Sequence, residues 1–123
     1  WDLRTQMLPD PDKVLSVASD RPLWWKPLVS QRRFDARHRQ IIVPLFNPPA
    51  EVEVVGSTPV APADGVRVNF AFAKGETVTA TLLSAEPVTH SAPLTVSRQG
   101  SGAQVQVPRF WGWTTVVFDC RKQ

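Results

Sequence analysis

Tryptophan is the residue type in this chain best suited to a specific chemistry, because flat indole rings stack on the faces of sugar rings. The 123-residue sequence holds five tryptophans, and four of them form two close pairs. Exposed rings would bury the C–H groups of a sugar while their rims stay wet. On a strand Trp111 and Trp113 would share one face, whereas Trp24 and Trp25 would point in opposite directions. We therefore take Trp24, Trp25, Trp111 and Trp113 as candidate carbohydrate-binding residues, the alternative being that they plug a small core.

Anion binding is the second candidate chemistry, because the net charge of +3 is unevenly placed. Residues 21–39 carry six Arg and Lys side chains against one Asp, while residues 40–123 sum to zero. Interleaved with aromatic residues, such a stretch could hold a phosphate backbone and stack bases. A solvated strand edge is the simpler interpretation, and docking on an acidic neighbouring domain is a third. The candidate polyanion-binding residues are Arg32, Arg33, Arg37 and Arg39; the absence of any nucleic-acid-binding motif disfavours nucleic acid as the partner.

The sequence shows no pattern for nucleophilic catalysis or metal binding. His38 and His90 lie in no metal-ligand spacing, and no G-x-S-x-G nucleophile motif occurs. Cys120 is the only cysteine, which excludes an internal disulfide and a multi-cysteine metal site. We expect a non-enzymatic domain without a metal or cofactor.

Two acidic pairs allow other chemistry but have simpler explanations. Glu51 and Glu53 share one face of an expected strand, at a separation that would also suit glycosidase carboxylates. A solvated strand face accounts for them. Asp10 and Asp12 could supply oxygen ligands to calcium, but turn chemistry beside two prolines explains them equally well.

Short strands must position all of these side chains, because the composition disfavours long helices. Pro accounts for 12 of the 123 residues and Val for 17, and both residue types are poor in helix interiors. Apolar residues make up 42% of the chain and charged residues 20%, which excludes disorder throughout. No apolar run approaches the roughly 20 residues that cross a bilayer, so no membrane span is expected.

Alternation of apolar and polar residues predicts an all-β, antiparallel, two-sheet β-sandwich, immunoglobulin-like or jelly-roll-like, of about seven or eight short strands. In the clearest strand, 66–72, one face carries Val66, Val68, Phe70 and Phe72. A turn at 74–76 predicts that this strand forms an antiparallel hairpin with 77–83, whose inward residues would be Val78, Ala80 and Leu82.

We expect a single domain in which residues 1–39 form an irregular lead-in or linker and residues 40–123 form the sandwich. The other expected strands are 41–46, 51–54, 94–97, 103–108 and 114–119. In the first of them, Val43 and Leu45 have the parity of Ile41.

A family pattern runs through the second half of the chain. Leu82–Pro87, Pro93–Leu94, Val105–Phe110 and Trp113–Phe118 follow one another in order, and Ile41–Pro48 precedes them. This pattern resembles the carboxy-terminal β-sandwich accessory domain that follows the catalytic barrel of glycoside hydrolases and related carbohydrate-active proteins. The rhythm is hydrophobic, with a few fixed residues, and contains no catalytic signature.

The resemblance covers about residues 20–119, and residues 24–33 are similar to the segment that joins barrel and sandwich in that family. It implies a non-catalytic role, because the catalytic carboxylates of the family belong to the barrel. The expected partner is a neighbouring catalytic domain of the same parent chain, with a polysaccharide as the alternative, in a secreted or periplasmic protein. Pro44 departs from the pattern and favours an edge position for its strand. Because the sequence starts at Trp1 without a Met, we expect it to be a piece of a longer chain.

Overall fold

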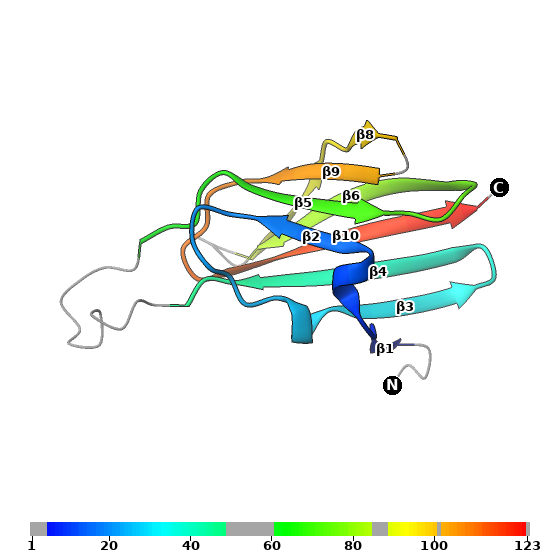
Figure 1. Ribbon diagram of the computed structural model, residues 1–123, viewed down its shortest axis with the longest axis horizontal. Helices are drawn as coiled ribbons and strands as arrows, with labels where there is room; N and C mark the ends of the chain where they lie inside the picture. The colour runs from blue at the N-terminus through cyan, green and yellow to red at the C-terminus, as the bar shows by residue number, and fades with distance from the viewer. Residues whose placement is uncertain (1–4, 49–60, 85–88, 101, 123) are drawn as a thin grey trace.

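Alternating apolar residues build two antiparallel sheets that pack face to face (Figure 1). The computed structural model describes residues 5–48, 61–84, 89–100 and 102–122. The sheets have the strand orders β1-β3-β4-β10-β6-β7 and β2-β5-β9-β8, which confirms the predicted all-β sandwich class. The strands are β1 (Thr5–Met7), β2 (Leu15–Ala18), β3 (Ser30–Asp35), β4 (His38–Phe46), β5 (Val66–Ala71), β6 (Glu76–Ser84), β7 (His90–Leu94), β8 (Ser97–Gln99), β9 (Gly102–Val107) and β10 (Trp113–Lys122), with single 3-10 turns η1 (Pro11–Lys13) and η2 (Lys26–Leu28).

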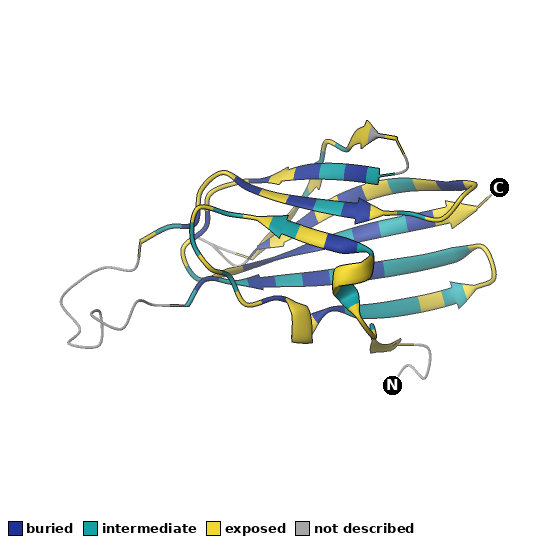
Figure 2. Ribbon diagram, in the orientation of Figure 1, coloured by how far each residue is buried: buried dark blue, intermediate teal, exposed yellow. Residues whose placement is uncertain are grey.

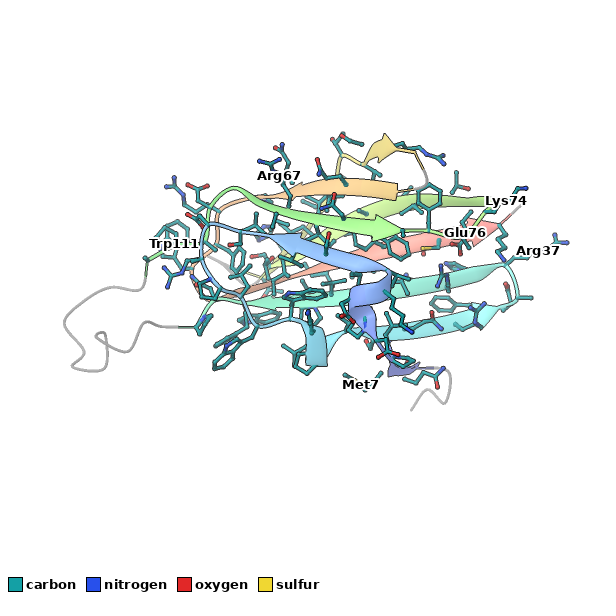
Figure 3. The ribbon with its side chains drawn as sticks, viewed as in Figure 1. Met7, Arg37, Arg67, Lys74, Glu76 and Trp111 are labelled. Atoms are coloured by element: carbon teal, nitrogen blue, oxygen red, sulfur yellow. The ribbon has the colours of Figure 1, made fainter. Side chains whose placement is uncertain are left out.

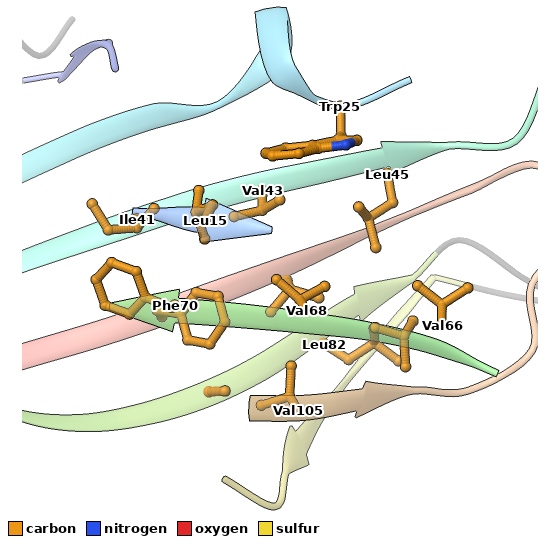
Figure 4. Packing of buried hydrophobic residues seen from close by; sticks show 14 of the residues in the cluster. Leu15, Trp25, Ile41, Val43, Leu45, Val66, Val68, Phe70, Leu82 and Val105 are labelled. Carbon is orange, nitrogen blue, oxygen red and sulfur yellow. The ribbon is translucent and has the colours of Figure 1, made fainter. Parts of the chain in front are cut away.

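The core lies between the sheets and is made chiefly of alternate residues of β4, β5, β6, β9 and β10, as Figure 2 shows by the alternating burial along these strands. From the six-stranded sheet, Ile41, Val43 and Leu45 of β4 point inward and are fully buried. The rings of Phe70 on β5 and Phe118 on β10 stack across the two sheets, with centroids 5.0 Å apart. Figure 4 shows how these inward side chains interlock. The described core is almost wholly aliphatic and aromatic, so burial of apolar area holds the sheets together.

The amino-terminal segment differs from the expected irregular lead-in. Within its described part, β1 and β3 belong to the six-stranded sheet and β2 to the four-stranded sheet. Val29, between η2 and β3, is fully buried in the core. Sequence periodicity does not reveal β3, because its residues are polar at both odd and even positions and apolar alternation is therefore nearly absent. Ten strands, rather than about seven or eight, therefore occur in the part of the chain that the structure describes.

The predicted hairpin between residues 66–72 and 77–83 is wrong. Both segments are strands with the predicted inward residues, but β5 pairs with β2 and β9, whereas β6 pairs with β10 and β7. The turn at Lys74–Gly75 carries the chain from one sheet to the other, helped by the positive φ of 86° at Gly75. Alternation shows which face of a strand is buried; it does not show whether the next strand lies beside it or opposite it.

The edge position predicted from Pro44 is also wrong for the strand as a whole, because β4 lies between β3 and β10. Pro44 is tolerated because pairing on the β3 side is interrupted beside it. The β3 ladder covers β4 only as far as Ile42, and the next contact is the isolated bridge between Trp24 and Phe46. The missing N–H of the proline falls in the gap between those contacts.

Candidate functional site

The two outer faces of the sandwich differ in chemistry. On the four-stranded sheet the outward row is polar: the Asn69 amide donates to Ser16 Oγ at 3.3 Å, and the Gln104 amide donates to Asn69 Oδ1 at 2.8 Å. An antiparallel sheet that faces water on one side is expected to be apolar inside and polar outside. The four-stranded sheet follows that rule.

The six-stranded sheet does not follow it. One outward row crosses all six strands through Met7, Ser30, Ile42, Val117, Thr81 and Pro93, each residue opposite the next. The neighbouring row contains Pro44, Thr115 and Leu83. Met7 is 58% exposed and Leu83 is 43% exposed. We call this surface the apolar face and define it by the outward side chains Met7, Trp24, Ile42, Pro44, Phe46, Leu83, Trp113, Thr115 and Val117.

Aromatic rings occupy one end of the apolar face. Trp113 on β10 lies opposite Phe46 on β4, and Trp24 bridges to the other side of Phe46. The Trp24 and Phe46 rings stack with centroids 5.3 Å apart and planes 23° apart. Trp24 and Trp113 nevertheless remain 60% and 47% exposed. Two partly exposed indole rings therefore face solvent on either side of Phe46.

A shallow hollow of about 420 Å³ opens beside Trp113. Leu83 and Ser91 of the adjoining strands line it. Most of its surface is apolar, although Ser84, Thr89 and His90 contribute to its rim. Its dimensions suit one large side chain or one sugar ring.

The four candidate tryptophans have different fates. Trp25 is only 9% exposed and packs in the core, so its prediction as a sugar-contacting residue is wrong. Its neighbour Trp24 is exposed, so the two adjacent rings face different ways, although they lie outside the named strands. Trp111 is 49% exposed but precedes β10, and Figure 3 places it at the end of the sandwich. Its main-chain oxygen accepts a 2.8 Å hydrogen bond from the buried amide of Asn47, which fixes this connection.

A polar cluster closes the opposite end of the apolar face. Asp119 Oδ1 accepts hydrogen bonds from His38 Nε2 at 2.7 Å and from Gln40 Nε2 at 3.2 Å. Its Oδ2 accepts one from Arg121 Nε at 2.9 Å. Burial raises the pKa of Asp119, but these three donors together lower that pKa below its ordinary value. The His38 ring also stacks on the ring of Phe34, with centroids 4.4 Å apart. The cluster is internally satisfied and presents a fixed polar border.

The four arginines predicted as an anion site do not form one surface. Arg39 points inward and makes two 2.8 Å hydrogen bonds to the Glu76 carboxylate, whose side chain is 3% exposed. Arg32 donates to Thr5 Oγ1 at 3.2 Å on the outer side. Arg33 and Arg37 are exposed. Of the four arginines, Arg39 therefore belongs to a buried ion pair, Arg32 bonds Thr5, and Arg33 and Arg37 remain as exposed cations.

Sequence reasoning missed most of the apolar face, including Phe46, Leu83 and Val117. A signal was present: the segment 41–46 is apolar at both parities, and so are 116–118. A continuous apolar run is typical of a strand covered on both faces. Tryptophan is a rare residue and stands out in a sequence, whereas the apolar runs of a strand covered on both faces consist of common aliphatic residues.

Other predicted features can be placed only in part. Glu51 and Glu53 lie outside the described residues. In the described ranges, no group of three or more His, Cys, Asp or Glu side chains is arranged to hold a metal ion. None of the helical segments described is long and apolar enough to cross a membrane. No protein-family model matches the chain, and no curated protein is significantly similar to it.

Proposed function

We propose that this chain is a non-catalytic accessory β-sandwich that docks through its apolar face on a neighbouring catalytic domain of a glycoside-hydrolase-like protein. The observation that carries the proposal is the contrast between the outer faces: the outward row described on the four-stranded sheet is polar, whereas the six-stranded sheet carries the apolar face, bordered by the His38–Asp119 cluster. The family resemblance of residues 20–119 supports the same role and is the reason for proposing a catalytic barrel as the neighbour. The docked domain would steady its neighbour and would contribute no reacting group.

The size of the apolar face favours a macromolecule over a small ligand. Measured between backbone positions, strand spacing gives it about 19 Å from β1 through β3, β4 and β10 to β6, and strand rise gives about 14 Å along β4, or roughly 270 Å². The side chains at its border extend it beyond that, toward the range of about 300–600 Å² in which apolar patches on a monomer are often interaction sites. A standard protein interface buries about 800 Å² on each partner, so a docked domain would also cover polar surface around the apolar face, beginning with the His38–Asp119 border.

Trp113 and Leu83 are the expected anchors of this interface. Both are large and about half exposed, and both border the hollow beside β7. Binding energy concentrates in a few aromatic or aliphatic side chains that become fully buried in a pocket. A bulky apolar side chain of the neighbouring domain fits the hollow between them.

A second candidate function, carbohydrate binding, is favoured by the same hollow, because an indole wall with hydroxyl groups at its rim suits a sugar ring. The ring geometry weakens this candidate. Trp24 and Phe46 stack on each other instead of lying side by side as a platform. Only Trp113 is left to contact a sugar in the hollow.

Polar substitution on the apolar face tests the docking proposal. We expect the double variant Trp113→Ser/Leu83→Ser to keep the stability of the chain within about 1 kcal/mol, because both side chains are exposed. In the longer parent protein the same variant lowers the melting temperature and activity of the catalytic domain. The matched control is Trp111→Ser, which removes an equally exposed tryptophan outside the apolar face.

Equal effects of the variant and the control on the parent protein would contradict docking through this face. Sugar binding is tested in parallel by titrating the chain with soluble polysaccharides and following tryptophan emission. A saturable change that Trp113→Ser abolishes, with no effect of that substitution on the parent enzyme, would replace docking by carbohydrate binding.

A further inference from the structure

Segments far apart in the sequence bring basic side chains to one end of the sandwich. Arg37 is in the β3–β4 turn and Lys74 in the turn before β6, while Lys122 ends β10. The Lys122 amide donates to the Arg37 carbonyl at 2.8 Å, and Lys122 lies opposite Glu76 in the sheet. Figure 3 shows Arg37, Lys74 and Glu76 together at the end opposite Trp111. Arg33 on β3 lies opposite Arg39, whose guanidinium holds Glu76 at this end. We call the exposed side chains of Arg33, Arg37, Lys74 and Lys122 the basic end.

The carboxylates at this end are largely engaged elsewhere. Glu76 is held by Arg39 and also accepts the Ala73 N–H at 2.8 Å. Asp119 is bound by His38, Gln40 and Arg121. Among the described residues near this end, the exposed carboxylate is that of Asp35, whose Oδ1 accepts the backbone N–H of Arg37 at 2.7 Å.

Among the described residues, the four cations of the basic end form no salt bridge. The pairs that do form involve Lys13, His38, Arg39, Arg109 and Arg121. These four cations outnumber the exposed carboxylate of Asp35, and the Glu76 carboxylate opposite Lys122 is already paired with Arg39. The remaining excess of positive charge creates a local potential that attracts anions. This clustering could not be seen in the sequence, because two of the four residues lie outside the basic stretch 21–39.

We propose that the basic end binds the carboxylates of an acidic protein surface. The proposal goes beyond docking through the apolar face, because it assigns a charge to the partner; it rests on the proposed function only for the partner being a protein. The basic end adjoins the His38–Asp119 border of the apolar face, since Arg121 belongs to that border and Lys122 follows it. One partner can therefore cover the apolar face and extend acidic side chains over this end.

The aromatic side chains near the basic end disfavour nucleic acid. Sequence-independent binding of single strands combines cations with exposed rings on which bases stack. Here the Phe34 ring is stacked on His38, and the Phe72 ring is covered by the Arg98 guanidinium at 4.7 Å. One face of each ring is therefore already occupied, which leaves less aromatic surface on which bases could stack. Charge is the recognition feature that remains, and it suits flexible carboxylates.

The test compares immobilised polyanions of three classes: poly-L-glutamate, oligodeoxythymidylate and polygalacturonate. We expect poly-L-glutamate to bind most tightly at about 20 mM NaCl and to be released at about 300 mM, because exposed charges are screened by salt. The variant Arg37→Glu/Lys122→Glu reverses two cations of the basic end. It is expected to weaken binding by about tenfold or more.

The matched control is Lys26→Glu/Arg67→Glu, which makes the same change in net charge at exposed positions away from this end. The control is expected to weaken binding by less than about threefold. Equal losses in the two variants would overturn the proposal, because net charge alone would then explain the binding. Tighter binding of either other polymer, or no binding at low salt, would overturn it as well.

This outcome is separable from that of the docking proposal. The variant Trp113→Ser leaves the basic end intact and should not change binding to poly-L-glutamate. Failure of docking through the apolar face therefore leaves the polyglutamate result standing, and failure of polyglutamate binding leaves the apolar face untouched.

Discussion

Arg39→Met is the substitution that most sharply tests how the end of the core is closed. Arg39 and Glu76 point inward from β4 and β6 and span β10 between them. The guanidinium lies 5.7 Å from the centre of the Phe70 ring and also donates to Gln31 Oε1 at 3.2 Å. The ion pair therefore plugs the open end of the sandwich beyond the last aromatic layer. Removing the guanidinium leaves a buried carboxylate with the Ala73 N–H as its described donor.

The expected cost follows from the burial of the two groups. Breaking a buried ion pair by removing one partner costs about 3–5 kcal/mol. The Arg39 side chain is 18% exposed, and water can partly replace it, so we expect about 2–4 kcal/mol for Arg39→Met. Replacing both partners by apolar residues, as Arg39→Met/Glu76→Leu, should restore the free energy of unfolding to within about 1 kcal/mol of that of the unsubstituted chain.

The same pair makes stability depend on pH in a stated direction. The hydrogen bonds from Arg39 hold the pKa of Glu76 below its ordinary value of 4.5, although burial opposes them. A carboxyl group with a depressed folded-state pKa stabilises the fold above the unfolded-state pKa and loses that contribution as the pH falls. We expect the unsubstituted chain to lose more stability below about pH 4.5 than the variant Glu76→Gln does.

Urea unfolding followed by tryptophan emission at pH 7 and at about pH 4 measures both effects. The double-mutant cycle isolates the coupling between Arg39 and Glu76 from the separate cost of each substitution. If Arg39→Met lowers the free energy of unfolding by less than about 1 kcal/mol at pH 7, and the two single substitutions are additive, the Arg39–Glu76 pair does not close the end of the core. If the stability of Glu76→Gln depends on pH as that of the unsubstituted chain does, the ionised Glu76 carboxylate is not the source of the pH dependence.

Further predictions concern the core and the loops. Trp25→Ala should cost about 3–5 kcal/mol in urea unfolding, whereas Trp24→Ala should cost less than about 1.5 kcal/mol; similar costs would contradict their opposite orientations. Asn47→Ala should cost about 2–3 kcal/mol, because the amide donates to the carbonyls of Ala61 and Trp111 at 2.9 and 2.8 Å. Burial raises the pKa of Cys120 to about 12, so a thiol reagent should react with it only as fast as the chain unfolds; rapid labelling of the folded chain would contradict this.

The inward-facing residues were the most predictable part of the fold. Ile41, Val43 and Leu45 were placed on one face by strand periodicity alone, and all three are fully buried. The same periodicity placed Val66, Val68 and Phe70 correctly. Burial of alternate residues is a local property of a strand, so a single sequence is enough to reveal it.

The arrangement of the strands was less predictable, because it depends on contacts between distant segments. The strands at 66–71 and 76–84 are neighbours in the chain yet lie in opposite sheets. Pairing of β4 with β10 joins residues about seventy positions apart, and no local pattern specifies such a partner.

The candidate site was visible in part. Trp24 and Trp113 were chosen for their side-chain type, and the structure adds Phe46 between them. The basic stretch drew attention to Arg37, but Lys74 and Lys122 join it only because three strand ends meet in space. The outward orientation of Leu83 and Met7 depends on register, which a single sequence does not define.

Oxidative footprinting of the tryptophans is the most direct test of docking through the apolar face. The chain described here and the proposed longer protein, in which it adjoins a catalytic domain, would be exposed to hydroxyl radicals, and modification of each tryptophan would be measured by mass spectrometry. The account predicts that Trp24 and Trp113 are protected several-fold in the parent, relative to Trp111, and equally reactive in the separate chain. Undiminished modification of Trp24 and Trp113 in the parent protein would contradict it.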